Sequence, residues 1–387
     1  MAERGARYTP AFFLTMLTGF LFFVSLHLLQ WTLPLYLSAS FSGATEIGLI
    51  IGLMAVSAVL LRPWAGEWAD RYGRRLVILL GAGCFAVSPL LYLIDGSLPA
   101  LVAGRLLHGV GICLFTTGYG SLIPDLAAQG SRGEAIGLAS ISMPISLMIF
   151  PRLGSLLQER FGFPLVFAAA SVTAVAALGL GMALPKGHFS RSTGVPSIPF
   201  RDVVKIPRLW AALAPVAVLA ACYGAIMSFM PLFAQDRGIP QGSYFFLGYG
   251  LALVLVSTHV GRLSDRWGRA RVIVPGMLGV LISLALLPLV DRLTPYLLLA
   301  FAYGLFSGAA KIGIDAFCVD SVPLEGRGAA ISLEFGVYDL GIGLGGWGLG
   351  AVLDAAGYGG MFAVMAFLLV IGLSAFVLLV RRNGSAS

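Results

Sequence analysis

Ionisable side chains stand inside strongly apolar stretches of this sequence, where an unpaired charge is costly to place in a membrane. Lys311 and Asp315 lie one helical turn apart, and Glu334 and Asp339 follow in the next apolar stretch. Burial raises the pKa of a carboxylate and a neighbouring cation lowers it, so such a group can load and release a proton when its partner moves. The pattern predicts proton coupling by Glu334, Asp339 and Asp315.

Structural roles are the alternative for the same charged groups. At i,i+4 spacing, Lys311 and Asp315 can neutralise each other within one helix and so ease its insertion. Glu334 stands at a depth similar to that of Lys311, which makes a Lys311–Glu334 pair a second arrangement. Asp339 can instead cap a break in its helix. Both interpretations stay open at this point.

A second set of polar and aromatic residues has the composition of a binding pocket. His27 and Gln30 are three residues apart, hence on one helix face, and His108 and Arg152 stand within later apolar stretches. An apolar pocket with a few polar groups suits an amphipathic small molecule. The same residues also fit ordinary helix packing, and Arg152 also fits a charge that reaches the membrane interface. The predicted substrate-binding residues are His27, Gln30, His108, Arg152, Tyr223, Met227, Lys311 and Tyr338.

Two short charged segments, GEWADRYGRR at 66–75 and GRLSDRWGRAR at 261–271, repeat one another. Their arginines suit a loop beside lipid phosphates. Asp70 and Asp265 oppose that charge bias, and a carboxylate beside guanidinium groups forms directional pairs. The segments therefore predict paired ionic clusters in addition to a topology signal.

Transmembrane helices are the elements that must position these residues. The chain of 387 residues is 58% hydrophobic and 11% charged, whereas soluble domains are about 45–50% apolar. The apolar stretches are long and continuous, which favours membrane-spanning helices over barrel strands. The sequence therefore predicts an all-α membrane protein. Its twelve transmembrane helices are expected near 11–36, 45–66, 76–94, 98–123, 135–157, 164–184, 209–233, 243–262, 271–290, 295–319, 328–353 and 360–380.

The basic residues predict the orientation of these helices. Most of the 25 Lys and Arg fall in alternate loops, which places both termini in the cytoplasm by the positive-inside rule. Topology then accounts for the net charge of +7 without a nucleic-acid partner. The first apolar stretch is too long for a secretory signal. We expect a multi-pass protein of the inner (plasma) membrane.

Sequence patterns for other chemistry are absent. The cysteines at 84, 113, 222 and 318 stand singly, which indicates neither a disulfide framework nor a zinc site. No phosphate-binding loop of the Walker A type and no nucleophile triad is recognisable. The sequence therefore predicts no catalytic residue, no metal and no cofactor, and a protein that is not an enzyme.

The chain is built from two copies of one pattern. A constant shift along the sequence aligns Gly66 with Gly261, Asp70 with Asp265, Arg74 with Arg269, Asp125 with Asp320, and Gly162 with Gly357. Each copy holds six predicted helices, an even number, so the copies are parallel repeats about an axis along the membrane normal. The predicted domains are an N-terminal bundle at 1–184, a cytoplasmic linker at 185–208 and a C-terminal bundle at 209–387.

On these residues the chain resembles a transporter of the major facilitator superfamily, in its drug/metabolite:proton antiporter branch. The family's loop motif, Gly-x-x-x-Asp-Arg-x-Gly-Arg-Arg, stands at 66–75 with a weaker second copy from 261. The resemblance implies two six-helix bundles around a central cavity and an ionic latch that closes its cytoplasmic side. The implied gate residues are Gly66, Asp70, Arg71, Gly73, Arg74, Arg75, Asp125, Gly261, Asp265, Arg266, Gly268, Arg269 and Asp320.

Two further motifs bear on the direction of transport. Arg105 matches the family's Arg-x-x-x-Gly in the fourth helix, which implies a role in proton coupling during export, unless it extends to the outer interface. In the fifth helix Pro151 and Gly154 match the exporter motif Gly-Pro-x-x-Gly-Gly, whereas Phe150 and Ser155 replace its glycines. This departure weakens the prediction of export.

We therefore expect a monomeric secondary active transporter that works by alternating access in the lipid bilayer. Its predicted activity is proton-coupled export of a small organic or amphipathic molecule. The alternative is a proton symporter that imports a small metabolite, anionic in view of Arg105, Arg152 and Lys311. A membrane sensor would carry large soluble signalling domains, and a membrane enzyme would gather its catalytic groups at one depth.

Overall fold

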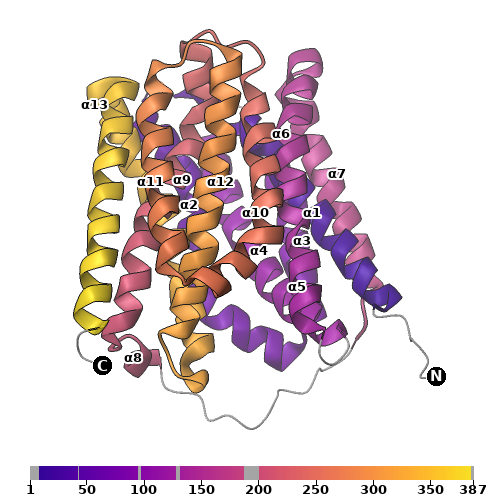
Figure 1. Ribbon diagram of the computed structural model, residues 1–387. Coiled ribbons are helices and arrows are strands. Elements are labelled where there is room, and N and C mark those ends of the chain that lie inside the picture. The colour runs from indigo at the N-terminus through magenta and orange to yellow at the C-terminus, as the bar shows by residue number, and fades with distance from the viewer. Residues whose placement is uncertain (1–7, 42, 95–96, 128–130, 187–199, 385–387) are drawn as a thin grey trace, which may run out of the picture. The chain divides into compact units, whose positions relative to one another are not determined.

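The computed structural model describes residues 8–41, 43–94, 97–127, 131–186 and 200–384, and the long elements within them are all helices (Figure 1). The first half contains α1 (Pro10–Ser40), α2 (Ala44–Tyr72), α3 (Arg74–Leu91), α4 (Leu98–Leu126), α5 (Arg132–Ser140), α6 (Ser142–Phe161) and α7 (Phe163–Met182). The second half contains α8 (Phe200–Val203), α9 (Pro207–Asp236), η1 (Gly242–Tyr244), α10 (Phe245–Trp267), α11 (Ala270–Leu286), η2 (Leu287–Leu289), α12 (Leu293–Asp320), η3 (Leu324–Gly326) and α13 (Arg327–Gly384). The predicted all-α class is confirmed.

Ten helices in the described part of the chain are long and apolar enough to cross a membrane. Gly242–Ser257 and His259–Trp267 pass the same test together, although they differ in direction by 51°, and they make an eleventh span if they are counted as one. The 58 residues of α13 hold two successive spans, because its helical conformation is interrupted at Gly357. These two parts of α13 correspond to the spans predicted at 328–353 and 360–380, so the structure accommodates twelve spans.

Glycines with positive φ stand at equivalent junctions in the two halves of the chain. Gly73 precedes α3 and Gly268 lies between α10 and α11, each with φ 93°. Gly162, with φ 80°, separates α6 from α7, and Gly357, with φ 67°, divides α13. A residue without a Cβ adopts this conformation at little cost. The predicted repeat is therefore visible in the backbone as well as in the sequence.

Contacts divide the chain into two compact units. Unit 1 contains residues 1–33 and 56–191, and unit 2 contains residues 34–55 and 192–387. In unit 1, α3 packs against α4 and α7, whereas in unit 2 α9 packs along α13, and α12 packs against α10 and α11. The boundaries predicted for the two bundles and the linker remain a prediction, and residues 187–199 of that linker lie outside the described residues.

Aromatic rings fill the core of unit 1. Phe22 of α1 stacks on Phe115 of α4 with ring centroids 3.7 Å apart and lies 4.1 Å from the ring of Phe85 of α3. All three side chains are fully buried. This packing fixes the three helices that carry His27, Arg105 and the arginines Arg74 and Arg75.

Candidate functional site

Lys311 of α12 lies between two carboxylates of unit 2. Its Nζ donates a hydrogen bond to Oδ1 of Asp315 at 2.5 Å and another to Oε1 of Glu334 at 2.7 Å. Asp315 is one turn along the same helix, where i,i+4 side chains are neighbours, and Glu334 comes from α13. The two acids compete for one ammonium group, so the cluster carries unbalanced negative charge when all three groups are ionised.

Exposure changes steeply across this cluster. The Glu334 side chain is only 3% exposed, that of Lys311 is 22% exposed and that of Asp315 is 44% exposed. A buried carboxylate needs a close cation or a proton, because burial of an unpaired charge costs several kcal/mol. Lys311 supplies that cation to Glu334, and Asp315 joins the buried pair to more open surroundings.

A row of tyrosines continues from the cluster. Lys311 Nζ lies 4.9 Å from the ring centroid of Tyr338, within range of a cation–π interaction. The Tyr338 ring lies 6.2 Å from that of Tyr223, which lies 6.3 Å from Tyr249, and Tyr249 lies 5.5 Å from Tyr303. The four tyrosines come from α13, α9, α10 and α12, so they tie all the helices around the cluster together.

A cavity of about 400 Å³ opens beside Asp315 within unit 2. Its lining residues are Arg269, Ile312, Asp315, Ala316, Val319 and Asp320. Every one of them except Arg269 belongs to a single face of α12. The cavity therefore extends from the lysine cluster to the second charged segment.

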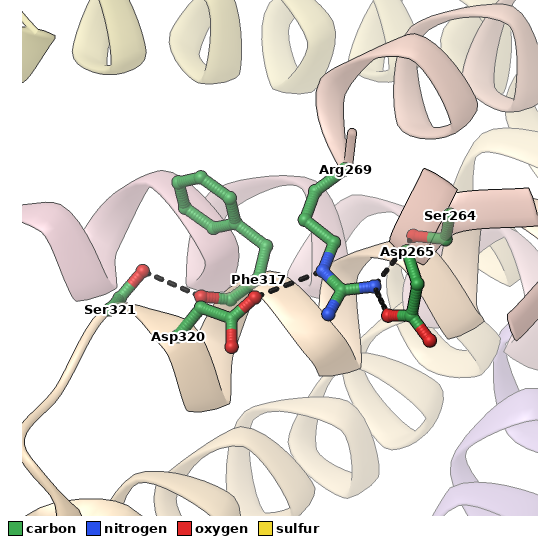
Figure 2. A network of polar contacts seen from close by, with 6 residues as sticks. All are labelled: Ser264, Asp265, Arg269, Phe317, Asp320 and Ser321. Atoms are coloured by element: carbon green, nitrogen blue, oxygen red, sulfur yellow. Dashed lines mark hydrogen bonds and ion pairs between the residues drawn. The ribbon is translucent and has the colours of Figure 1, made fainter. Parts of the chain in front are cut away.

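Arg269 binds carboxylates from two neighbouring helices (Figure 2). Its Nε donates to Oδ2 of Asp320 at 2.9 Å, and its Nη1 donates to Oδ1 of Asp265 and, at 3.2 Å, to Oγ of Ser264. Burial lowers the pKa of this guanidinium, but its hydrogen bonds to Asp320 and Asp265 outweigh that effect and raise it. The predicted pairing of Asp265, Arg269 and Asp320 is present in the structure.

The first charged segment makes the equivalent cluster in unit 1. Arg74 forms an ion pair with Asp125 and donates to the carbonyl oxygen of Ser121, and Asp70 lies close enough to act on it electrostatically. Arg75 donates to the carbonyl of Gly181 through Nε at 3.3 Å and to that of Met182 through Nη2, at the end of α7. Helix-terminal carbonyls lack intrahelical partners, so this arginine caps α7.

The remaining residues of the charged segments lie at or near helix ends. Arg71 and Arg266 are exposed, and the Arg71 guanidinium lies 5.4 Å from the ring centroid of Tyr72. Gly66 and Gly261 have open space at the Cβ position. Gly73 and Gly268 supply the positive φ described above. Their roles in a gate remain predictions.

Histidines of unit 1 are held by buried partners that the sequence did not indicate. Nδ1 of His27 forms a hydrogen bond with Oγ of Ser146 of α6, and Nδ1 of His108 lies 2.8 Å from the hydroxyl of Tyr92, the residue directly after α3. Arg105, 6% exposed, also donates to the Tyr92 hydroxyl. Arg105 and His108 therefore meet at Tyr92, on the side of α4 that packs against α3.

Arg152 has a partner on its own helix. Its Nη1 donates to Oε1 of Glu159 at 3.2 Å and approaches Oγ of Ser155, which itself donates to Glu159 at 2.7 Å. The Glu159 side chain is 52% exposed. Glu159 lies near the end of α6, so the ion pair directs Arg152 toward that end, and both its binding role and its alternative at the membrane interface remain predictions.

The remaining predicted residues are distributed over both units. Met227 is buried on α9 one turn from Tyr223, Asp339 is partly buried directly after Tyr338 on α13, and Gln30 is partly buried on α1. The structure thus brings Lys311, Asp315, Glu334, Tyr338 and Tyr223 together in unit 2. His27, Gln30, Arg105, His108 and Arg152 belong to unit 1, so a pocket built from both sets remains a prediction.

Asp354 of α13 is a polar residue that sequence reasoning missed. Its Oδ1 accepts from the backbone N–H of Ala44 at 2.7 Å, and its Oδ2 accepts from the backbone N–H and the hydroxyl of Thr45 at 2.8 and 2.5 Å. These donors are at the first turn of α2, where unpaired N–H groups and the helix dipole favour a carboxylate. Asp354 thus caps a helix from the other half of the sequence.

Glycines let the same two helices approach closely. A Cβ added to Gly48 of α2 would lie 2.1 Å from the carbonyl oxygen of Gly346, and one added to Gly345 would lie 2.2 Å from that of Ala221 on α9. Small residues permit such contact between helices in lipid. The glycine-rich stretch of α13 is therefore packed on two sides within unit 2.

Comparison with known proteins gives consistent results. The family model described as Major Facilitator Superfamily matches residues 12–258 and 240–387. Multidrug resistance protein 1 of Bacillus subtilis is 28% identical over 162 residues, which is 42% of either chain, so the match spans less than half of that relative. The MFS-type transporter YhhS of Escherichia coli is 28% identical over 344 residues, 84% of this chain and 81% of YhhS. The quinolone resistance protein NorA of Staphylococcus aureus is 26% identical over 152 residues, 39% of either chain.

Solved structures share the fold at low sequence identity. The nucleoside transporter NupG aligns with a TM-score of 0.81 and 15% identity, covering 95% of this chain and 99% of NupG. The human organic anion transporter MFSD10 aligns with a TM-score of 0.71 and 18% identity, covering 95% and 100%. At such identities the likeness concerns the fold alone.

Proposed function

The chain belongs to the Major Facilitator Superfamily and is a multi-pass membrane transporter, and on that premise we propose that it exports a small organic or amphipathic molecule in exchange for protons. The observation that carries the proposal is the buried Lys311–Glu334 ion pair, joined to Asp315. Ionisable side chains inside a membrane span are costly, and where they occur they mark substrate or ion paths. We place the protein in the inner (plasma) membrane as a monomer with both termini in the cytoplasm.

Proton binding to Glu334 would convert this pair into a switch. A proton added to a Glu334 oxygen removes its negative charge, so the attraction to Lys311 falls and the ammonium turns to Asp315, which already accepts from it. Glu334 and Lys311 belong to α13 and α12, so loss of the pair loosens one helix from the other. Release of the proton restores the pair and the original packing.

Export is the proposed direction of transport for two reasons. Distant relatives carry the names of drug resistance proteins, and Arg152 is paired with Glu159 on its own helix. Multidrug resistance proteins and a quinolone resistance protein are among the sequences that this chain resembles. The alternative is a proton symporter that imports an anionic metabolite with the help of Arg152. Its use of Arg152 is disfavoured because that arginine donates to Glu159.

Alternating access would use ionic clusters at helix ends. We assign the Arg74–Asp125 and Arg269–Asp320 pairs to the cytoplasmic gate, as the family resemblance implies. The contact between Asp354 of α13 and the first turn of α2 would act at the other end of α2.

A proteoliposome assay tests the proposal. Purified protein is reconstituted with a pH-sensitive dye inside, a pH gradient is imposed and a panel of amphipathic amines, neutral drugs and organic acids is added. Exchange predicts compound-dependent proton movement opposite to the compound, whereas symport predicts movement in the same direction. Glu334→Gln should abolish the coupled flux, and the matched control Glu325→Gln, at an exposed residue of η3, should retain it. Absence of proton movement with every compound would reject proton coupling.

A further inference from the structure

The cavity beside Asp315 follows one face of α12. Residues 312, 315, 316, 319 and 320 line it, and this i, i+3, i+4, i+7, i+8 spacing is that of a single helical stripe. Asp315 stands near one end of the stripe and Asp320 near the other, about 7.5 Å apart along the helix axis at 1.5 Å per residue. Arg269 completes the wall at the Asp320 end.

Glu334 reaches this cavity only through its ionic partners. The Glu334 side chain is almost completely buried, and its described ionic contact is the ammonium of Lys311, which also binds Asp315. Asp315 is the one member of the cluster that lines the cavity. The groups facing Glu334 from α12 are Lys311, Asp315 and the buried Cys318, and Tyr338 lies one turn along its own helix.

We propose that this cavity is the path by which protons pass between Glu334 and the water at the Arg269–Asp320 end of α12, with Asp315 as the intermediate carrier. The inference rests on the proposed function, which makes Glu334 the proton site, and adds its route. The basic residues place this end of α12 in the cytoplasm.

The transfer can be written as two balanced steps. The O–H bond of protonated Glu334 breaks and a new O–H bond forms on a carboxylate oxygen of Asp315, directly or through one water, while Lys311 keeps its protons and moves its hydrogen bond to the Glu334 anion. Asp315 then gives its proton to water in the cavity and again accepts a hydrogen bond from Lys311. No oxidant or other reactant is needed.

The mouth of the path is built from the same groups as the ionic cluster of unit 2. Arg269 is paired there with Asp320 and Asp265, so two carboxylates face one guanidinium. A rearrangement of Arg269 would also reshape the cavity, so gate movement and proton access are linked.

The test is a pH-jump infrared measurement on the full-length protein in lipid nanodiscs, with the proton itself as the probe. The carboxylic-acid band of Glu334 is identified by its loss in Glu334→Gln. Ala316→Leu, which fills the cavity without changing charge, should slow the appearance of that band about tenfold and leave its midpoint pH unchanged. Ala285→Leu makes the same substitution at an exposed position of α11 and should match the wild type.

A second variant guards against misfolding of the first. Asp315→Asn removes the carrier and should also slow proton uptake, whereas a structural role alone would move the midpoint but not the rate. Wild-type rates in both variants would overturn the route and leave Glu334 as the proton site. A wild-type spectrum without any band that is lost in Glu334→Gln would overturn the proton site and the route together.

Discussion

Asp354 accepts a hydrogen bond from the backbone N–H of Ala44 at 2.7 Å, although 310 residues separate them in the sequence. The contact joins the start of α2 to the middle of α13, and Thr45 adds two further hydrogen bonds to the same carboxylate. It is a helix cap supplied from a distant part of the chain.

Removal of this cap should shift the transporter toward the state in which the start of α2 is free. Loss of an N-cap acceptor costs about 1 kcal/mol, so Asp354→Ala should change the ratio of the two states about fivefold. Spin labels at Leu49 of α2 and Leu344 of α13, both exposed residues of unit 2, in a background without native cysteines, would report it as longer distances. Asp291→Ala, at a carboxylate that is 75% exposed, is the control; equal distributions in both variants would remove Asp354 from the gate.

The Arg74–Asp125 and Arg269–Asp320 ion pairs should contribute similarly to the proposed cytoplasmic gate. Asp125→Asn and Asp320→Asn each break one ion pair of a partly exposed arginine, so each should weaken the closed state by about 1 kcal/mol or less. The effect should diminish at high salt because ions screen these charges. Labels at Leu76 and Leu324 measure it. A large effect of one variant with none from the other would contradict equivalent roles.

Alkaline pH should leave the Arg269 cluster intact. Burial lowers the pKa of Arg269, but Asp320 and Asp265 raise it overall, and a cation with a raised pKa loses its stabilising contribution only as the pH rises through that folded-state value. The pH at which this contribution is lost lies above the physiological range. The distance between the labels at Leu76 and Leu324 should therefore be constant from about pH 7 to about pH 10. In Arg269→His the same gate should loosen as the pH rises through about 6.5, and identical profiles would contradict an ionic role.

Lys311 and Glu334 should show strong coupling in a double-mutant cycle. Lys311→Met leaves Glu334 buried without its cation, which we expect to lower the free energy of unfolding by about 3–5 kcal/mol. Lys311→Met combined with Glu334→Gln removes both charges and should recover much of that loss. Thermal unfolding in detergent provides the measurement. Simple additivity of the two single effects would argue against a direct interaction between Lys311 and Glu334.

Close packing at Gly48 should make that position intolerant of a single methyl group. Gly48→Ala places a Cβ 2.1 Å from the carbonyl oxygen of Gly346, so α2 must move away from α13 and the melting temperature should fall. Gly179→Ala is the matched control, since a Cβ at this helical glycine of α7 meets nothing within 4 Å. There alanine should be neutral or stabilising, because it favours helix more than glycine does. Equal stability of the two variants would show that α2 can move away from α13 at little cost in free energy.

Local spacing explains what the sequence could predict. Long apolar stretches specify the spans, and the i,i+4 spacing of Lys311 and Asp315 already places those side chains together. The aligned Asp–Arg segments predicted both ionic clusters, because a repeated sequence in a repeated fold makes the same contacts.

Contacts between distant helices explain what it could not predict. Ser146 is one of several serines in its apolar surroundings, so nothing in its position marks it as the partner of His27. Asp354 was missed for a related reason, since its partners are backbone N–H groups, which no side-chain pattern reveals. Arg152, by contrast, contacts Ser155 and Glu159 of its own helix at i+3 and i+7, a spacing that puts the three on one face and that the sequence could have shown.

The break at Gly357 leaves the last two spans without a flexible connection. One residue with φ 67° turns the chain, and helical conformation resumes directly after it. Inserting a single amino acid into the helix just after this turn, before Met361, would rotate everything downstream by about 100° and swing the buried face of Met361, Phe362 and Met365 out toward lipid. Epitope tags, protease sites and fluorescent labels should therefore be kept away from this turn.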